Sequence, residues 1–155
     1  PQTESADDTN FYTYTDASGN TYDLFEIVKW QEDENHCVTA VTGRFERVVT
    51  DDDCETGEYA NNGQTVTFPL AADFSAMMLS SMTDADMWMI PVTDLRAWYI
   101  SAYLDGTAPE SGEIVFAYDV SQEDAAFDFW FITVRIALND AGEVAYMEYE
   151  YVPWG

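Results

Sequence analysis

The fold is decided by residues 127–152, FDFWFITVRIALNDAGEVAYMEYEYV, which read as one β-hairpin. Two apolar and aromatic runs flank a turn at residues 139–143, where Gly142 can take the positive φ that a short hairpin loop needs. Successive side chains of a strand point to opposite faces, and both alternate sets of the first run are largely apolar. We therefore expect this hairpin to be buried at the centre of the fold.

Working outward, the rest of the chain also favours strands. Alternating β-branched and aromatic residues predict strands over residues 11–15, 21–30, 37–50, 65–70 and 113–120. The sequence therefore predicts a mainly β fold, a barrel or a sandwich of about seven to eight largely antiparallel strands. An α+β fold is the alternative.

One or two short helices are expected in the region 73–105. Asp73 is a good N-cap residue, and Phe74, Met77, Met78 and Met82 follow it at helical spacing. A second helix is predicted to begin at the Thr93 cap and to stop before Gly106, with the apolar residues Leu95, Trp98, Tyr99, Ala102 and Tyr103 on one face.

The length of 155 residues fits one domain, which we place at residues 11–155. Residues 1–10 are polar and read as a flexible leader. No apolar run approaches the roughly 18 residues of a transmembrane helix, so we expect no membrane insertion.

Charge is the strongest compositional signal. Thirty acidic residues stand against five basic ones, which gives a net charge of −25. Nucleic-acid binding depends on Lys and Arg displacing counterions, so we expect no nucleic-acid partner. The acidic surface is explained by adaptation to high salt, by cation binding, by docking of a basic partner protein, or by a compositional bias without a specific role.

The two cysteines, Cys37 and Cys54, predict a disulfide bond, which would place the protein outside a reducing cytosol, either secreted or at the cell surface. Their Cα atoms would have to lie within about 7 Å. An unbroken strand between them would span roughly 50 Å. The pairing therefore requires a reversal of the chain, with Gly43 as the expected pivot.

One candidate metal site follows from the same region. Asp51, Asp52, Asp53 and Glu55 form a dense group of carboxylates, and calcium prefers such oxygen ligands. Their spacing does not match that of a calcium-binding EF-hand loop. Calcium is thus a possible ligand, and no other cofactor is expected.

Methionine and aromatic side chains suggest a second kind of site, a pocket for a hydrophobic small molecule. Methionine and aromatic residues line many cavities that hold hydrophobic small molecules. The candidate ligand-binding residues are Met78, Trp88, Trp98, Tyr99, Trp130 and Tyr149.

Three functions compete on these observations. The preferred one is binding of a hydrophobic small molecule by a secreted, acidic, barrel-like domain. The second is a small β-barrel enzyme of isomerase or cyclase type, in which one buried carboxylate moves a proton. The acids set in apolar strands are its candidates: Asp23, Glu26, Asp119 and Asp128. The third is an acidic interaction protein that binds cations or a basic partner.

The net charge predicts that salt stabilises the fold. Raising sodium chloride from about 0.1 M to about 1 M shortens the Debye length from about 10 Å to about 3 Å and so weakens the repulsion among the acids. We expect the melting temperature to rise over this interval. A melting temperature that stays flat or falls would contradict the high-salt interpretation, and a rise with millimolar calcium but not with matched sodium would favour a cation site.

Overall fold

The computed structural model describes residues 10–34, 37–79, 87–99 and 132–152. Within these ranges the chain forms nine strands, two 3-10 helices and one short α-helix. In chain order they are β1 (Tyr14–Thr15), β2 (Thr21–Tyr22), β3 (Leu24–Glu32), β4 (Val38–Asp51), β5 (Cys54–Tyr59), η1 (Ala60–Gly63), β6 (Val66–Leu79), β7 (Met87–Pro91), η2 (Val92–Asp94), α2 (Leu95–Tyr99), β8 (Ile132–Leu138) and β9 (Val144–Tyr149).

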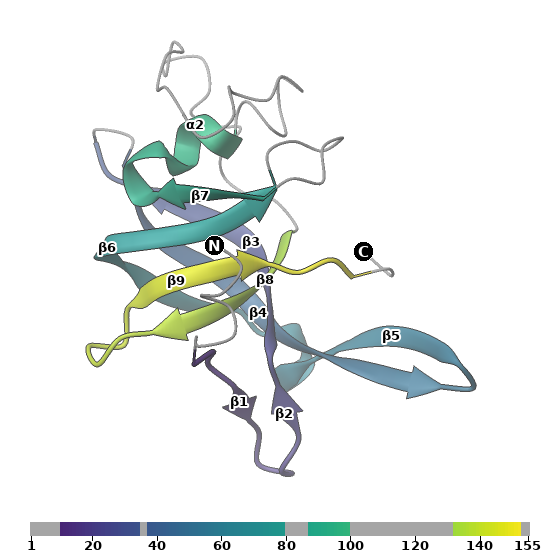
Figure 1. Cartoon of the computed structure of the whole chain (residues 1–155). Helices are drawn as coiled ribbons and strands as arrows, with labels where there is room; N and C mark the ends of the chain where they lie inside the picture. The colour runs from purple at the N-terminus through teal and green to yellow at the C-terminus, as the bar shows by residue number, and fades with distance from the viewer. Residues whose placement is uncertain (1–9, 35–36, 80–86, 100–131, 153–155) are drawn as a thin grey trace.

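Five of these strands close a barrel (Figure 1). The order around it is β3–β4–β6–β9–β8 and back to β3, and β6–β9 is the parallel pair among these contacts. The expected mainly β fold is confirmed, and it takes the form of a barrel.

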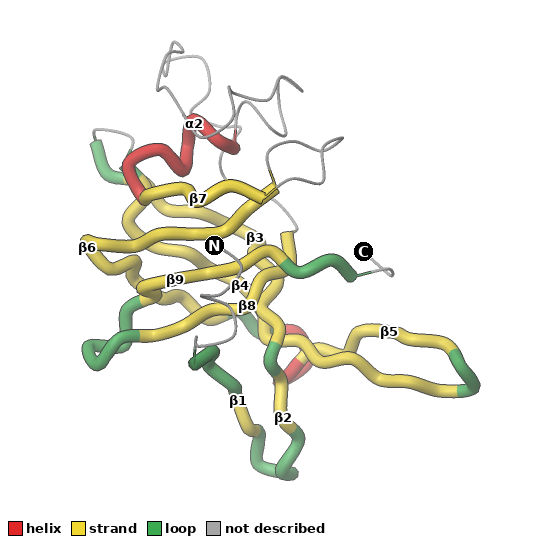
Figure 2. Tube along the Cα trace, viewed as in Figure 1, coloured by secondary structure: helices red, strands yellow, loops and turns green. Residues whose placement is uncertain are grey.

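The remaining strands extend the barrel (Figure 2). β5 pairs with the end of β4, and β7 pairs with β6 outside the closed ring. β1 and β2 form a separate two-stranded sheet. Helix α2 lies beside β7 at one end of the barrel. It is tied down by the ion pair of Arg96 with Glu32 of β3 and by the Trp98 indole N–H, which donates to the Leu79 carbonyl.

The C-terminal hairpin forms as its sequence predicts. β8 and β9 pair from Val134 with Tyr149 to Leu138 with Val144. Asn139 shapes the turn, because its side-chain Oδ1 accepts hydrogen bonds from the backbone N–H groups of Ala141 and Glu143, at 3.0 and 2.9 Å. Gly142 takes the expected positive φ of 82°. Residues 127–131 of the predicted first strand, and the predicted strand over 113–120, lie outside the described residues.

β4 and β6 are the longest strands of the barrel, and β4 is shared between the barrel and the β4–β5 hairpin. The fourteen residues of β4 pair with β3 along one edge and with β6 and then β5 along the other. Gly43 pairs with Ile27 of β3, next to a register shift in the β3–β4 ladder. A Cβ atom there would come within 2.4 Å of the Glu26 carbonyl oxygen and 2.6 Å of the Phe25 ring. Only glycine therefore fits at this close approach of the two strands.

The predicted disulfide is wrong. Cys37 immediately precedes β4 and Cys54 begins β5, and both thiols are free and exposed. The chain does turn back, but at residues 52–53, after the whole of β4 rather than at Gly43. Because β4 stays continuous through Gly43, it holds the two cysteines at its opposite ends. The disulfide argument for a secreted or cell-surface location falls with the bond, and that location stays a prediction.

The helix predicted from Asp73 is also wrong. β6 runs without a break from Val66 to Leu79, and it buries Phe74, Ala76 and Met78 on one face. A register shift between Leu70 and Ser75 in its pairing with β9 disturbs the alternation of apolar residues that would have indicated a strand. The second predicted helix begins as expected, with η2 and α2 covering Val92–Tyr99. Its continuation toward Gly106 lies outside the described residues.

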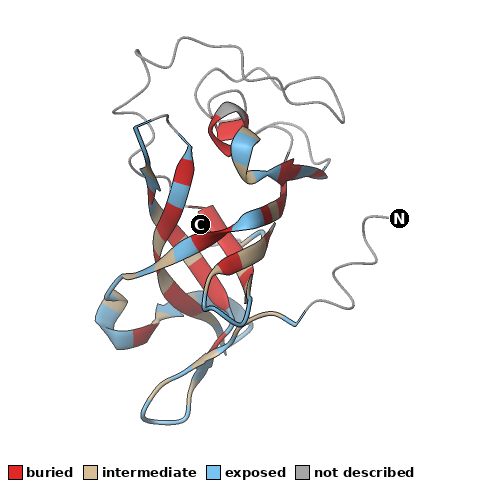
Figure 3. Ribbon diagram, turned by 90° about the vertical axis from the view of Figure 1, so that its left-hand side faces the viewer, coloured by how far each residue is buried: buried red, intermediate tan, exposed pale blue. Residues whose placement is uncertain are grey.

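The interior of the barrel is apolar and aromatic. Figure 3 shows that buried residues are distributed along the strands of the barrel. At one end, the Phe45 ring contacts four other rings at centroid distances of 5.2 to 6.0 Å, those of Tyr12, Tyr14, Phe25 and Phe68. Two of these come from the segment around β1, which therefore caps this end of the barrel.

Replacing Gly43 by alanine tests this close approach of β3 and β4. Because the added methyl group would meet both a backbone carbonyl and the Phe25 ring, we expect Gly43→Ala to lower the free energy of unfolding by about 1–3 kcal/mol. Urea denaturation measures this change. Thr50→Ala, at an exposed position of the same strand, is the control and should change stability by less than about 0.5 kcal/mol. Equal midpoints for the two variants would contradict the packing argument.

Candidate functional site

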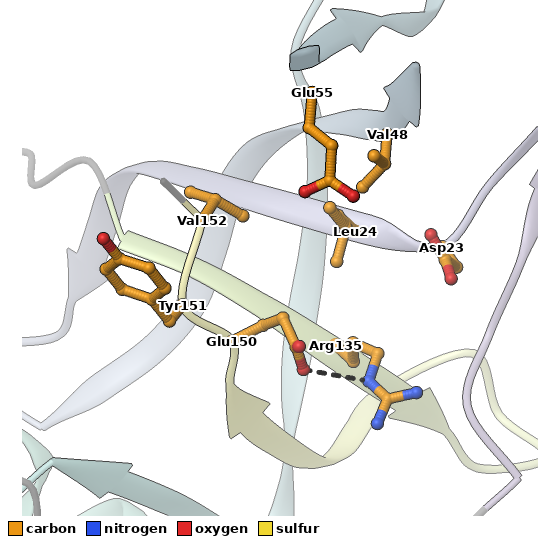
Figure 4. A pocket seen from close by; sticks show the side chains of 8 residues that line it. All are labelled: Asp23, Leu24, Val48, Glu55, Arg135, Glu150, Tyr151 and Val152. Atoms are coloured by element: carbon orange, nitrogen blue, oxygen red, sulfur yellow. Dashed lines mark ion pairs between the residues drawn. The ribbon is translucent and has the colours of Figure 1, made fainter. Parts of the chain in front are cut away.

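A pocket of about 340 Å³ opens beside the β4–β5 arm, which we define as residues 46–59 (Figure 4). We call it the arm pocket. Four separate parts of the chain line it: the start of β3, the arm, β8 and the segment after β9. The lining residues are Asp23, Leu24, Val48, Glu55, Arg135, Glu150, Tyr151 and Val152.

The arm presents one of its faces to this pocket. Asp52 and Asp53 form a two-residue turn with φ of 53° and 65°, the backbone conformation of a type I′ hairpin. The register that this turn sets pairs Thr50 with Glu55 and Val48 with Gly57. Glu55 and Val48 consequently share a face, and both reach the pocket.

Arg135 forms the opposite wall. Its Nε lies 3.4 Å from Oε1 of Glu150, and its guanidinium carbon is 4.4 Å from the centroid of the Phe11 ring. The backbone N–H of Glu150 donates to the Thr133 carbonyl at 2.9 Å, which holds the segment after β9 against β8. Arg135 is the only basic residue in the pocket lining, and it is already paired with Glu150 of the same lining.

The charge of the arm pocket is negative. Its lining contains three acidic residues, Asp23, Glu55 and Glu150, and one basic residue, Arg135. Leu24, Val48 and Val152 form the apolar part of the wall. A Lys or Arg side chain complements such a lining, because its flexible stem is apolar and its end group is a cation. The arrangement therefore suits a cationic group carried on an apolar stem.

The base of the arm is anchored on the pocket face by a polar cluster. Oε1 of Glu26 accepts from Nη2 of Arg44 at 2.5 Å and from the Tyr59 hydroxyl at 2.8 Å. The Arg44 guanidinium carbon lies 4.4 Å from the centroid of the Tyr59 ring. Burial, the hydrogen bond to Glu26 and the charge of that carboxylate together raise the pKa of Tyr59 to about 12.

The other face of the arm is anchored to the β1–β2 sheet. Nε of Arg47 donates to Glu58 at 2.7 Å, and the Arg47 guanidinium carbon is 5.6 Å from the Tyr22 ring centroid. The Tyr22 hydroxyl in turn donates to Asp16 at 2.9 Å. Contacts on both faces thus hold the base of the arm against the rest of the fold.

The predicted hydrophobic-ligand residues lie elsewhere. Met78, Trp88, Trp98 and Tyr99 are buried members of the core, and Tyr149 is half-buried and packs against it. Burial raises the pKa of both tyrosines, and at Tyr149 the neighbouring Tyr151 and Glu150 act in the same direction. Trp130 lies outside the described residues. The structure thus gathers four of the six residues in the core, and binding of a hydrophobic small molecule stays a prediction.

The predicted metal ligands do not form a cluster that could hold an ion. Asp51, Asp52, Asp53 and Glu55 are exposed at the tip of the arm. Within the described ranges, no group of three or more His, Cys, Asp or Glu side chains is arranged for a metal ion. Of these four acids, only Glu55 lines the arm pocket.

The acids considered for proton transfer are dispersed. Asp23 is an exposed member of the arm pocket, and Glu26 belongs to the cluster with Arg44 and Tyr59. Asp119 and Asp128 lie outside the described residues. An enzymatic role therefore stays a prediction as well.

Sequence reasoning missed most of the arm pocket. Leu24, Val48, Arg135, Glu150, Tyr151 and Val152 carry no local motif, and the folded chain brings them together from distant segments. Arg135 offered one signal, because it is the sole cation in the apolar C-terminal hairpin of a chain with only five cations.

No family model matches the sequence, and searches of curated proteins and of solved structures found no match either. No helix in the described part of the chain is long and apolar enough to cross a membrane. The function is therefore argued from the site alone.

The raised pKa of Tyr59 predicts a pH-dependent contribution to stability. Because the folded state holds the phenol proton more tightly than the unfolded chain does, this contribution is complete below about pH 10 and is lost as the pH rises toward 12. Tyr59→Phe removes the hydrogen bond to Glu26, and we expect it to cost about 1 kcal/mol at pH 8. Urea denaturation between pH 8 and 11 should show the two proteins converging as pH rises. Tyr151→Phe, at a largely exposed position, is the control, and a constant gap between wild type and Tyr59→Phe would contradict the assignment.

Proposed function

We propose that this protein is an acidic binding module that docks a basic segment of a partner protein, with a Lys or Arg side chain entering the arm pocket. The observation that carries the proposal is the pocket lining, in which Asp23, Glu55 and Glu150 surround a partly apolar wall. A cation with an apolar stem satisfies both parts of this lining at once.

The distribution of the basic residues supports the same proposal. Each of the four arginines is in an ion pair with a glutamate of the same chain: Arg44 with Glu26, Arg47 with Glu58, Arg96 with Glu32 and Arg135 with Glu150. With thirty acids in the sequence, most carboxylates have no arginine to pair with. Lys29 is the one further basic side chain of the sequence, so positive charge for most of them has to come from solvent ions or from a partner.

Charge also determines which partners are disfavoured. Some small five-stranded β-barrels bind oligonucleotides. A net charge of −25 would repel a phosphate backbone, and only five basic residues are available to displace its counterions. A basic polypeptide is therefore the partner that this surface fits.

Substitutions in the pocket test the proposal by isothermal titration of a synthetic peptide in which lysine alternates with threonine, in about 0.1 M salt. Glu55→Gln should weaken binding by about two- to fivefold, the usual range for a partly exposed ion pair. Glu150→Gln should weaken it further, because Arg135 then faces the incoming cation without its partner. Arg135→Gln should strengthen binding, because it frees Glu150.

Asp140→Asn is the matched control. It removes one negative charge from the exposed turn between β8 and β9, outside the pocket lining. Its affinity should stay close to that of the wild type. Equal effects of Asp140→Asn and Glu55→Gln would show that only overall charge matters. The absence of any binding to basic peptides would refute the proposed function.

A further inference from the structure

β5 is the end strand of the seven-stranded sheet, and its outer edge has no strand beside it among the described residues. It pairs with β4 alone, and the arm projects from the barrel (Figure 1). The exposed main chain of such an edge is a template for a further strand.

The register of the arm shows which main-chain groups face outward. In a two-residue hairpin, the residues that flank the turn exchange both hydrogen bonds, and the following pairs alternate between bonded and non-bonded. Asp51 and Cys54 flank this turn, so Cys54, Thr56 and Glu58 bond to β4. Glu55 and Gly57 fall in the non-bonded pairs, and their N–H and C=O groups point to the open edge.

The same edge adjoins the arm pocket. Glu55 offers its backbone to the open edge and its carboxylate to the pocket. Opposite Val48, Gly57 carries no side chain on the pocket face, and Val48 remains 45% exposed. A strand laid along β5 would therefore place alternate side chains over this face.

Charge selects the occupant of the edge. The arm carries six acids and one arginine, and that arginine is paired with Glu58. A second copy of this chain would bring the same acids to the edge and be repelled. In an extended segment with Lys or Arg at alternate positions, all the basic side chains would lie on the pocket face. One of them would then lie beside Glu55.

We propose that β5 receives a basic, extended peptide by strand addition, with main-chain hydrogen bonds to Glu55 and Gly57 and one basic side chain in the arm pocket. This rests on the proposed function, because it specifies how the basic segment is held. Main-chain bonds give affinity in this binding mode, and pockets for alternate side chains give specificity.

The experiment uses the lysine–threonine peptide and two N-methylated versions of it. In one version alternate residues are methylated, and in the other the remaining residues are methylated. An added strand turns every second N–H toward β5, so one version should bind about tenfold more weakly than the other. In hydrogen exchange, the unmethylated peptide should protect the amides of Glu55 and Gly57.

The matching protein variant is Gly57→Pro, which removes an outward N–H at an edge position where proline is tolerated. We expect it to weaken binding about tenfold, and Gly57→Ala, which keeps the N–H, to restore most of the loss. The methylated peptides decide the question if Gly57→Pro fails to fold.

The outcomes separate the two proposals. Equal affinity of both methylated versions, or protection absent at Glu55 and Gly57, would overturn strand addition while cation docking in the pocket stands. If no basic peptide binds, the proposed function fails and strand addition fails with it. Dimers of the protein alone that protect the same two amides would show that a second copy occupies the edge, which would also overturn the proposal.

Discussion

The structure depends on the continuity of β4. This one strand bonds to β3 along one edge and to β6 and β5 along the other, so it both closes the barrel and projects the arm. The close approach of β3 is possible because Gly43 leaves room for the Phe25 ring and the Glu26 carbonyl. Because the arm is an extension of a barrel strand, its faces are fixed relative to the barrel. The position of Val48 and Glu55 at the pocket follows from that.

The sequence could predict elements whose signals are local. The C-terminal hairpin has period-2 runs around a strong turn, and β8, β9 and Gly142 lie where that pattern puts them. The first part of β6 was predicted as a strand over residues 65–70, but the part from Asp73 onward was not predictable in the same way. A buried strand shows no clean alternation, and the spacing of Phe74, Met77 and Met78 fits a helix equally well. Only the pairing with β7 and β9, which is tertiary information, resolves that ambiguity.

Long-range geometry explains the other failures. The disulfide required Cys37 and Cys54 to meet, and the chain does reverse between them. The reversal comes at Asp52 and Asp53, however, and nothing in composition distinguishes a reversal there from one at Gly43. The arm pocket was equally hidden, since its lining comes from four segments. Of the lining, only Asp23 and Glu55 were singled out from the sequence, the first as an acid for proton transfer and the second as a metal ligand, because local patterns identified these residues but not the surroundings that define their chemistry.

An acidic surface that is adapted to high salt can still bind a basic partner under those conditions. At about 1 M salt the Debye length is about 3 Å, so attraction at long range is screened and the repulsion among thirty acids is relieved. Charges in direct contact inside a pocket are screened less, and main-chain hydrogen bonds along a strand edge involve no net charge. A module that combined the arm pocket with the β5 edge would therefore keep its short-range recognition under the conditions that favour its fold. Its association would then lose electrostatic steering, so the affinity would rest on the lifetime of the complex rather than on the rate of encounter.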